Sequence, residues 1–310
     1  MASVLPGRLW NSSGIDKIWR SRENTKVYFG KEFVIVMKSK TLRIPPRLAR
    51  KALTAAYKAI PLSDYRIRLA RKYFQGAASL YGCIPLGCLF QILEAVHEGL
   101  LTKEEFCAFA AIARQETDGY YIMSWETDEV EEREEMLDWC LVTPYLVVDG
   151  KARACVQEAQ LRHGRWYVPE KEELLSYAEG IYPAAGEALQ AFAAFLYAHR
   201  KTPAMDLADL FADLEERERY RMGDMDEARR CIESGGIVLA SEEDEKEWEA
   251  LYKAFHEASR MPALGGATPA EMKEMEARSG GAAQKPEKSG VFGIEKYYDT
   301  VFTKMKPGKK

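Results

Sequence analysis

The sequence predicts a mainly α-helical protein, and three observations support this fold class. Apolar residues recur at i, i+3, i+4 and i+7 along most of the chain, which is the spacing of one face of a helix. Ser or Thr is followed three residues later by Asp or Glu at Thr102, Ser241 and Thr268, a pattern that caps the start of a helix. The 310 residues are 47% hydrophobic, so the chain can bury a large core.

The N-terminal region is predicted to hold an irregular arm, a small β-hairpin and one helix. Residues 1–24 show no periodicity. Val27–Phe29 and Glu32–Met37 are typical of two strands joined by Gly30-Lys31, because the first position of a type II′ turn needs a positive φ. The pair Pro45-Pro46 predicts a helix that runs to Ile60, since proline is tolerated in the first helical turn.

Three helices followed by two short strands are predicted next, which is the order of elements in a winged helix. The helices are expected at 64–81, at 85–97 and from Thr102 onward, and the strands at Tyr120–Trp125 and Pro144–Val148, with an acidic helical segment at Asp128–Asp138 between them. A helix that reads DNA carries basic or amide side chains. The third helix begins Lys103-Glu104-Glu105. The sequence therefore predicts a winged-helix-like module whose third helix does not read DNA.

The rest of the chain is predicted to be helical, interrupted by glycine and proline. Helices are expected at 169–178, 184–200, 205–221, 225–234 and 242–260, and another from Thr268. The predicted division of the chain is 1–62 for a basic arm, hairpin and helix; 63–150 for the winged-helix-like module; 151–278 for a helical domain; and 279–310 for a flexible linker and a short C-terminal helix.

The net charge of −4 conceals an uneven distribution of charge. Residues 1–72, the basic head, hold 17 Lys and Arg against four Asp and Glu, which gives +13. Residues 283–310 carry +4, so the acidic body between these segments carries −21. A basic head on an acidic body either binds a polyanion or docks on its own body. Both explanations stay open from the sequence.

Two groups of residues are candidates for binding. Basic residues line the two predicted helices of the basic head and are candidates for nucleic-acid binding: Arg47, Arg50, Lys51, Lys58, Arg68, Arg71 and Lys72. Apolar residues at helical spacing follow the linker and either pack on the core or dock in a groove of a partner. These candidates for partner docking are Ile294, Tyr297, Tyr298, Val301 and Phe302.

The sequence predicts no catalytic residue, no metal site and no cofactor. None of the common nucleophile, phosphate-loop, dinucleotide or zinc-protease motifs occurs. Arg162-His163-Gly164 resembles the signature of histidine phosphatases, but no buried strand precedes it. Glu94-x-x-His97 has the spacing of a helix-borne metal ligand pair, and no second copy accompanies it. We therefore expect a protein that is not an enzyme.

Targeting signals and cysteine usage predict a cytoplasmic protein. No apolar run reaches the roughly 18 residues that a membrane span needs, and no signal-peptide core follows Met1. The six cysteines include no C-x-x-C pair, which favours free thiols in a reducing compartment.

Four segments from Leu80 onward resemble a group of bacterial proteins, mostly from Gram-positive organisms, many of which carry a C-terminal SEC-C zinc motif. They are Leu80–Ile84, Leu101–Phe106, Trp166–Leu174 and Gly266–Met272, the last resembling a closing G-x-T-P-x-E-[LM] segment. The zinc motif itself is absent, because no cysteine follows Cys231. The resemblance implies a helical protein and supplies no catalytic activity.

Three functional hypotheses follow from the sequence. The first is a regulatory or adaptor protein that acts through contacts with a protein partner. The second is a nucleic-acid-binding protein that uses the basic head. The third is an inhibitor whose acidic body imitates nucleic acid, as inhibitors from mobile elements such as phage can.

Overall fold

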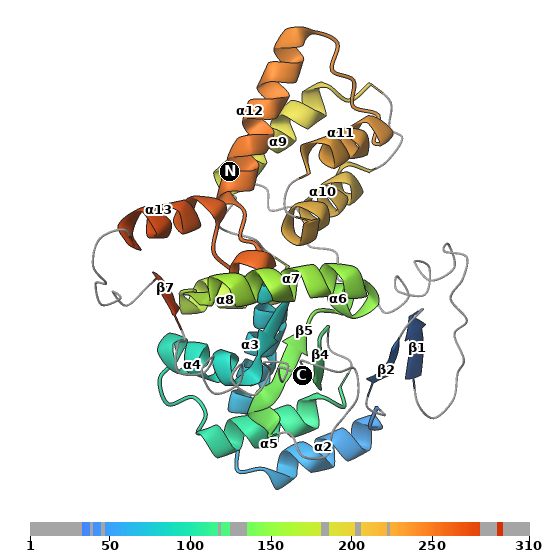
Figure 1. Ribbon diagram of the computed structural model, residues 1–310. Coiled ribbons are helices and arrows are strands. Elements are labelled where there is room, and N and C mark those ends of the chain that lie inside the picture. The colour runs from blue at the N-terminus through green and yellow to red at the C-terminus, as the bar shows by residue number, and fades with distance from the viewer. Residues whose placement is uncertain are drawn as a thin grey trace, which may run out of the picture.

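The computed structural model describes residues 33–37, 40–44, 47–116, 119–124, 135–180, 186–201, 206–221, 224–279 and 290–293. The described chain is mainly helical, as predicted, and its strands form small antiparallel sheets. Figure 1 shows helices α2 to α5 around a short sheet at the bottom, α6 to α8 across the middle, and α9 to α12 at the top. None of the described helices combines the length and the apolar character that a membrane crossing requires.

The N-terminal hairpin consists of β1 (Phe33–Met37) and β2 (Lys40–Ile44), with Met37 opposite Lys40. The predicted strand Glu32–Met37 is thus largely present, but its partner follows it in the sequence. The predicted turn at Gly30-Lys31 lies outside the described residues. Two residues separate β1 from β2, the commonest loop length of a hairpin. The predicted strand at Val27–Phe29 lies outside the described residues.

Helix α3 (Asp64–Tyr81) occupies the predicted position. Helix α2 (Arg50–Ala59) is present, but the prediction that it starts at Pro45-Pro46 is wrong, because residues 47–49 are not helical and the backbone of Ala49 is extended. The Ser63 side chain accepts a hydrogen bond from the backbone N–H of Arg66, and α3 ends at Gly82, whose φ is 66°. Both features agree with the signals for helix start and helix end in the sequence.

A three-stranded antiparallel sheet follows α3 and is interleaved with the next helices. Its strands are β3 (Cys83–Pro85), β4 (Tyr121–Ser124) and β5 (Trp139–Val142), in the order β3-β5-β4. Helices α4 (Leu86–Val96) and α5 (Lys103–Ala113) lie between β3 and β4 in the sequence. The predicted capping box at the start of α5 is present, with Thr102 and Glu105 each bonded to the other's backbone N–H.

One prediction in this region is wrong, and another falls mostly on residues that the structure does not describe. Pro144–Val148 was predicted as a strand, but it forms helix α6, because Pro144 occupies the first helical turn, where its missing N–H costs nothing. The second strand is instead β5, whose four residues are all buried. Of the predicted acidic helical segment at 128–138, residues 128–134 lie outside the described part, and Met136–Asp138 form the short 3₁₀ helix η1.

Helix α7 (Gly150–His163), strand β6 (Arg165–Val168) and helix α8 (Lys171–Ala178) complete the lower part of the molecule. Neither α7 nor β6 is among the elements that the sequence predicts. Asp149 caps α7 by accepting hydrogen bonds from two backbone N–H groups, and Gly164 ends the helix.

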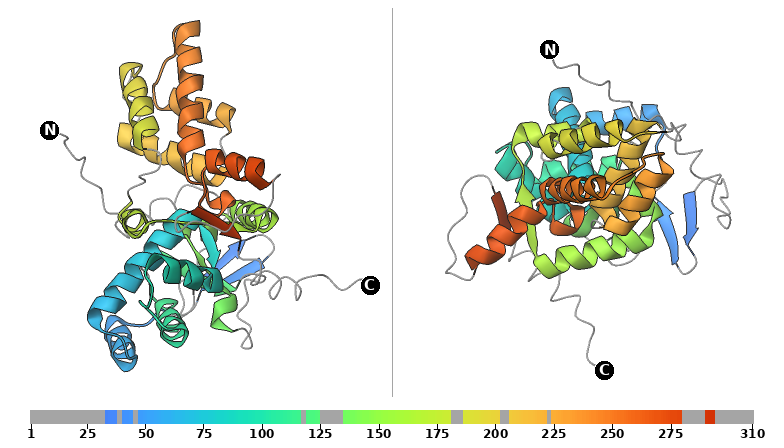
Figure 2. Two further views of the ribbon diagram at one scale, coloured as in Figure 1. Left: turned by 90° about the vertical axis from the view of Figure 1, so that its left-hand side faces the viewer. Right: turned by 90° about the horizontal axis from the view of Figure 1, so that it is seen from above.

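The upper helices follow the predicted order. They are α9 (Gly186–Ala198), α10 (Leu207–Arg221), α11 (Met225–Ser234), α12 (Glu242–Ala258) and α13 (Pro269–Ser279), with the 3₁₀ helix η3 (Pro262–Leu264) before α13. Figure 2 shows α9 to α12 standing as one group above α7 and α8, with α13 between this group and the lower part.

Two large hydrophobic clusters correspond to this arrangement. The first spans Tyr57 to Tyr177 and centres on the side chains of α3, α4 and α5, with Phe74, Phe106 and Phe109 fully buried. The second lies among α9 to α12 and includes Phe192 and Phe255, whose rings stack at 5.7 Å. The 3₁₀ helix η3, between α12 and α13, contacts α3 and α7 of the lower part and α10 of the upper part, and Tyr220 at the end of α10 packs in a smaller cluster with residues of β3, β5 and α7.

The C-terminal segment differs from the prediction where it is described. Strand β7 (Gly290–Gly293) pairs antiparallel with β6, with Trp166 opposite Phe292. Of the segment 279–310, predicted as a flexible linker and a short C-terminal helix, Gly290–Gly293 are therefore neither linker nor helix, because their backbone is extended along β6. The partner-docking candidates Ile294, Tyr297, Tyr298, Val301 and Phe302 all lie outside the described residues.

Candidate functional site

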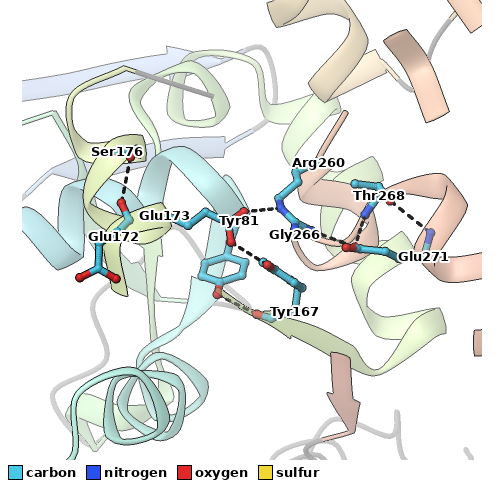
Figure 3. A network of polar contacts seen from close by, with 9 residues as sticks. All are labelled: Tyr81, Tyr167, Glu172, Glu173, Ser176, Arg260, Gly266, Thr268 and Glu271. Atoms are coloured by element: carbon cyan, nitrogen blue, oxygen red, sulfur yellow. Dashed lines mark hydrogen bonds and ion pairs between the residues drawn. The ribbon is translucent and has the colours of Figure 1, made fainter. Parts of the chain in front are cut away.

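Arg260, directly after α12, lies at the centre of a buried polar network at the junction of the two clusters (Figure 3). Its Nε donates to Glu173 Oε1 at 2.6 Å and its Nη1 to Glu271 Oε2 at 2.8 Å. Its guanidinium carbon lies 3.4 Å from the centre of the Tyr167 ring. Burial disfavours the charged form of Arg260, but the two carboxylates outweigh it and raise the pKa of the guanidinium. Arg260 therefore stays charged in the interior.

A second layer of hydrogen bonds fixes the partners of Arg260. The Tyr167 hydroxyl donates to Glu173 Oε2 at 2.6 Å, and the Tyr81 hydroxyl donates to the Tyr167 carbonyl at 2.8 Å. The fully buried amide of Gln160 donates to the carbonyls of Tyr81 and Pro262 at 3.0 and 2.7 Å. These bonds connect α3, α7, β6 and the segment before α13 in one network.

Three of the four segments for which the sequence predicts a resemblance to the SEC-C-bearing proteins meet at this network. Tyr81 comes from Leu80–Ile84, Tyr167 and Glu173 come from Trp166–Leu174, and Glu271 comes from Gly266–Met272. The segment Gly266–Met272 also holds the predicted capping box of α13, in which Glu271 Oε2 accepts a hydrogen bond from the backbone N–H of Thr268 at 2.9 Å. Glu271 thus both starts a helix and neutralises Arg260. These residues hold the fold together, and their charged groups already have partners.

A second buried polar cluster lies inside the upper helices. Glu218 of α10 is fully buried, accepts a hydrogen bond from the Tyr252 hydroxyl at 2.6 Å, and pairs with His256 Nδ1. The hydrogen bond with Glu218 raises the pKa of His256, against the effect of burial; Glu257 and Lys273 are the other charged groups near the imidazole. One turn earlier in α10, burial raises the pKa of Glu215 to about 7.

The stability of the upper helices is expected to depend on pH through His256. Because the folded pKa of this imidazole is raised, its pairing with Glu218 stabilises the protein fully below about pH 6.5, and this stabilisation is lost as pH rises through the folded pKa. Urea denaturation of wild type and His256→Gln at pH 6.0 and pH 8.5 measures this. The difference in the free energy of unfolding between wild type and His256→Gln should be larger at pH 6.0 than at pH 8.5. Titration of Glu215 does not contribute to this difference, because both proteins contain Glu215. An equal difference at both pH values would contradict the prediction.

His97 and His199 each contact neighbouring residues of the fold. His97 Nδ1 lies 3.0 Å from the Tyr73 hydroxyl. His199 Nδ1 lies 2.9 Å from the Phe195 carbonyl and stacks on the Phe195 ring. The phosphatase-like tripeptide ends α7: Arg162 pairs with Glu158 one turn earlier, and Gly164 has the left-handed conformation of a helix end.

The cysteines are free thiols, as the sequence predicted. Cys83, Cys88, Cys140 and Cys231 are buried, and Cys231 donates to Asp213 Oδ2 at 3.0 Å. Within the described ranges, no cluster of three or more His, Cys, Asp or Glu side chains has an arrangement that holds a metal ion.

The seven basic candidates do not form one uniform surface. Arg71 Nη2 is paired with Glu116 and also lies over the Tyr57 ring, and Lys72 pairs with Glu179 at 3.0 Å. Five of the seven candidates precede this pair and are exposed: Arg47, Arg50, Lys51, Lys58 and Arg68. The predicted intramolecular partners of this surface are the acidic residues 129–135, of which 129–134 lie outside the described part of the chain and Glu135 is exposed. Two of the seven side chains, those of Arg71 and Lys72, are therefore engaged in intramolecular ion pairs.

No protein-family profile, curated protein or solved structure matches this chain. The resemblance to the SEC-C-bearing proteins accordingly remains a prediction, and the function is argued from the geometry.

Proposed function

We propose that this chain is a non-enzymatic regulatory or adaptor protein whose residues 64–142 form a winged-helix-like module that serves protein contacts. The order of elements supports the winged-helix comparison. Helix α3 is followed by β3, then by α4 and α5, and then by the hairpin strands β4 and β5, and the last strand lies between the other two. A winged helix has this order and this sheet.

The surface of α5 is the observation that carries the proposal. In a DNA-binding winged helix, the equivalent third helix inserts exposed side chains into the major groove. In α5 and the turn that follows it, no residue between Glu105 and Glu116 is exposed. Beyond its first turn, where Lys103 and Glu104 are exposed, α5 therefore lacks the row of exposed side chains with which a recognition helix reads base edges.

Neighbouring segments account for this burial of α5. The backbone N–H of Leu48, just before α2, donates to the Gln115 carbonyl, and the Tyr57 ring of α2 packs 5.6 Å from Phe109. The residues of η1 contact α5 from another side. At the amino end of α5, Arg66 donates two hydrogen bonds to the Glu105 carboxylate, which holds the pKa of Glu105 below its usual value. The acidic end of α5 is also unsuited to meet phosphate groups.

The adaptor proposal is tested by reconstitution with a purified partner. Tagged full-length chain is cross-linked in the cells that express it, a recovered protein is purified separately, and the two are mixed after nuclease treatment. We expect a complex of fixed stoichiometry in size-exclusion chromatography with light scattering. Turnover in a broad hydrolase screen, or a complex that disappears with the nucleic acid, would overturn the proposal. A complex that dissociates steeply with salt would favour the acidic-mimic alternative.

The second candidate function is nucleic-acid binding by the exposed basic residues of α2 and α3. In the described chain, no ion pair occupies Arg50, Lys51, Lys58 or Arg68. If all four contact phosphates, the logarithm of the binding constant should fall by about 3.6 per decade of salt, since each contact contributes about 0.9. This estimate omits Arg71 and Lys72, because both are engaged within the protein.

Fluorescence anisotropy with a short labelled duplex separates the two functions. Under the adaptor proposal, we expect no binding at about 50 mM salt, with no difference between wild type and the double variant Lys51→Glu/Arg68→Glu. Arg68 is a better position for charge reversal than Arg71, because reversal of Arg71 would also break its ion pair with Glu116. Binding that shows the salt slope above and is lost in the double variant would establish the nucleic-acid function instead.

A further inference from the structure

The backbone of β6 has two edges with different partners. On one edge, the backbone N–H of Tyr167 donates to the Gly265 carbonyl at 2.9 Å, and the Tyr167 carbonyl accepts from the Tyr81 hydroxyl at 2.8 Å. Both polar backbone groups of Tyr167 therefore face the Arg260 network. This edge of β6 is fixed by the interior of the protein.

The other edge, called here the outer edge of β6, is formed by the backbone groups of Trp166 and Val168. Backbone N–H and C=O groups alternate in direction along a strand, so those of Trp166 and Val168 point away from the network. Strand β7 lies on this side, with Trp166 opposite Phe292 and Val168 opposite Gly290. These two pairs are consequently the hydrogen-bonded pairs of the ladder, and Tyr167 opposite Val291 is not.

Strand β6 does not depend on β7 for its position. The Trp166 side chain is fully buried and packs edge-on against Tyr81 at 5.6 Å, and Val168 is also buried. A strand that is held by its own side chains keeps its outer edge in place when a neighbouring strand leaves. An unpaired edge of this kind presents free N–H and C=O groups and accepts another extended chain.

Strand β7 has the properties of a replaceable occupant. It is only four residues long, Gly290-Val-Phe-Gly293, and glycine at both ends lowers its preference for an extended conformation. It follows the end of α13 by ten residues, so a segment of another protein would have to compete with a strand of the same molecule.

We infer that the outer edge of β6 is a docking site for an extended peptide segment of a partner protein, and that β7 occupies this site in the isolated chain as an intramolecular competitor. The occupant that the chain itself provides indicates what the site accepts: four uncharged residues in an antiparallel strand, with an N–H opposite Trp166. Binding by strand addition is a common mode of peptide recognition. The inference rests on the proposed adaptor function and gives that function a location.

Two proline variants of the full chain test the pairing. Phe292→Pro removes the N–H that faces Trp166, whereas Val291→Pro removes an N–H that points away from β6, which an edge strand tolerates. Residue-resolved amide exchange should become at least tenfold faster at Trp166 and Val168 in Phe292→Pro only. The Tyr167 amide, held by Gly265, should keep its wild-type rate in both variants. Equal rates at Trp166 in wild type and Phe292→Pro would overturn the inference.

The docking step is tested with a labelled synthetic peptide of residues 286–296. It should bind the Phe292→Pro chain at least tenfold more tightly than wild type, and the same peptide carrying Phe292→Pro should not bind. Absence of binding to the Phe292→Pro chain would overturn the docking site. A dimer of the wild-type chain that Phe292→Pro dissociates would identify a second copy as the occupant and overturn the choice of a partner. These readouts do not depend on whether the chain binds nucleic acid, so the inference and the proposed function can fail separately.

Discussion

Replacing Arg260 by methionine is expected to lower the free energy of unfolding by roughly 3–5 kcal/mol, the usual cost of removing one partner from a buried ion pair. The Arg260 side chain is 8% exposed, and Glu173, at 15%, is nearly as buried. Methionine has a similar length and fills most of the space. The cost therefore comes mainly from a Glu173 carboxylate that is left in the interior without its cation. Urea denaturation followed by circular dichroism measures the change.

Two further variants show whether this interpretation is right. Lys72→Met removes an ion pair whose side chains are 52% and 57% exposed, and it should cost less than about 1 kcal/mol. The triple variant Arg260→Met/Glu173→Gln/Glu271→Gln removes the orphaned charges as well and should recover part of the lost stability. If Arg260→Met costs no more than Lys72→Met, the network does not hold the two clusters together.

Local signals in the sequence were sufficient for most of the helices. Ser63, Thr102 and Thr268 each begin a helix, because capping depends on residues three positions apart. Strand β5 was missed because four consecutive buried residues show no alternation, which leaves strand and helix indistinguishable by periodicity. Helix α7 was missed because its apolar residues form no clear stripe, and it is held by the buried Gln160 instead.

The polar network could not be predicted, because its members are far apart in the sequence. Glu173 and Arg260 are separated by 87 residues, and Arg260 looked like an ordinary basic residue at a helix end. The capping pattern at Thr268 identified Glu271 but not its second role. For the seven basic candidates, the sequence predicted a binding role for two residues that are in fact paired within the protein. Arg71 and Lys72 lie on a helix with other basic residues, but Glu116 and Glu179 pair with them from distant segments.

Gly265 offers a second test of the same junction, with a matched control in the chain. Gly265 and Gly164 have nearly equal φ values of 62° and 61°. A Cβ on Gly265 would lie 2.2 Å from the Arg165 carbonyl oxygen, whereas a Cβ on Gly164 would meet nothing within 4 Å. The two positions therefore share the cost of a left-handed residue and differ only in the available space.

Gly164→Ala is expected to cost about 1–2 kcal/mol, the cost of a left-handed conformation for a residue with a Cβ. Gly265→Ala should cost this amount plus a further 1–3 kcal/mol or so for overpacking, because the obstacle is the backbone of β6 rather than a flexible side chain. Denaturation of both variants gives the difference. Relief of the overlap requires β6 to move away from Gly265, so the Tyr167 amide, which donates to the Gly265 carbonyl, should exchange faster in Gly265→Ala only. Equal losses in the two variants would mean that β6 and the segment before α13 are not in close contact in solution, and the Arg260 network could not then exist as described.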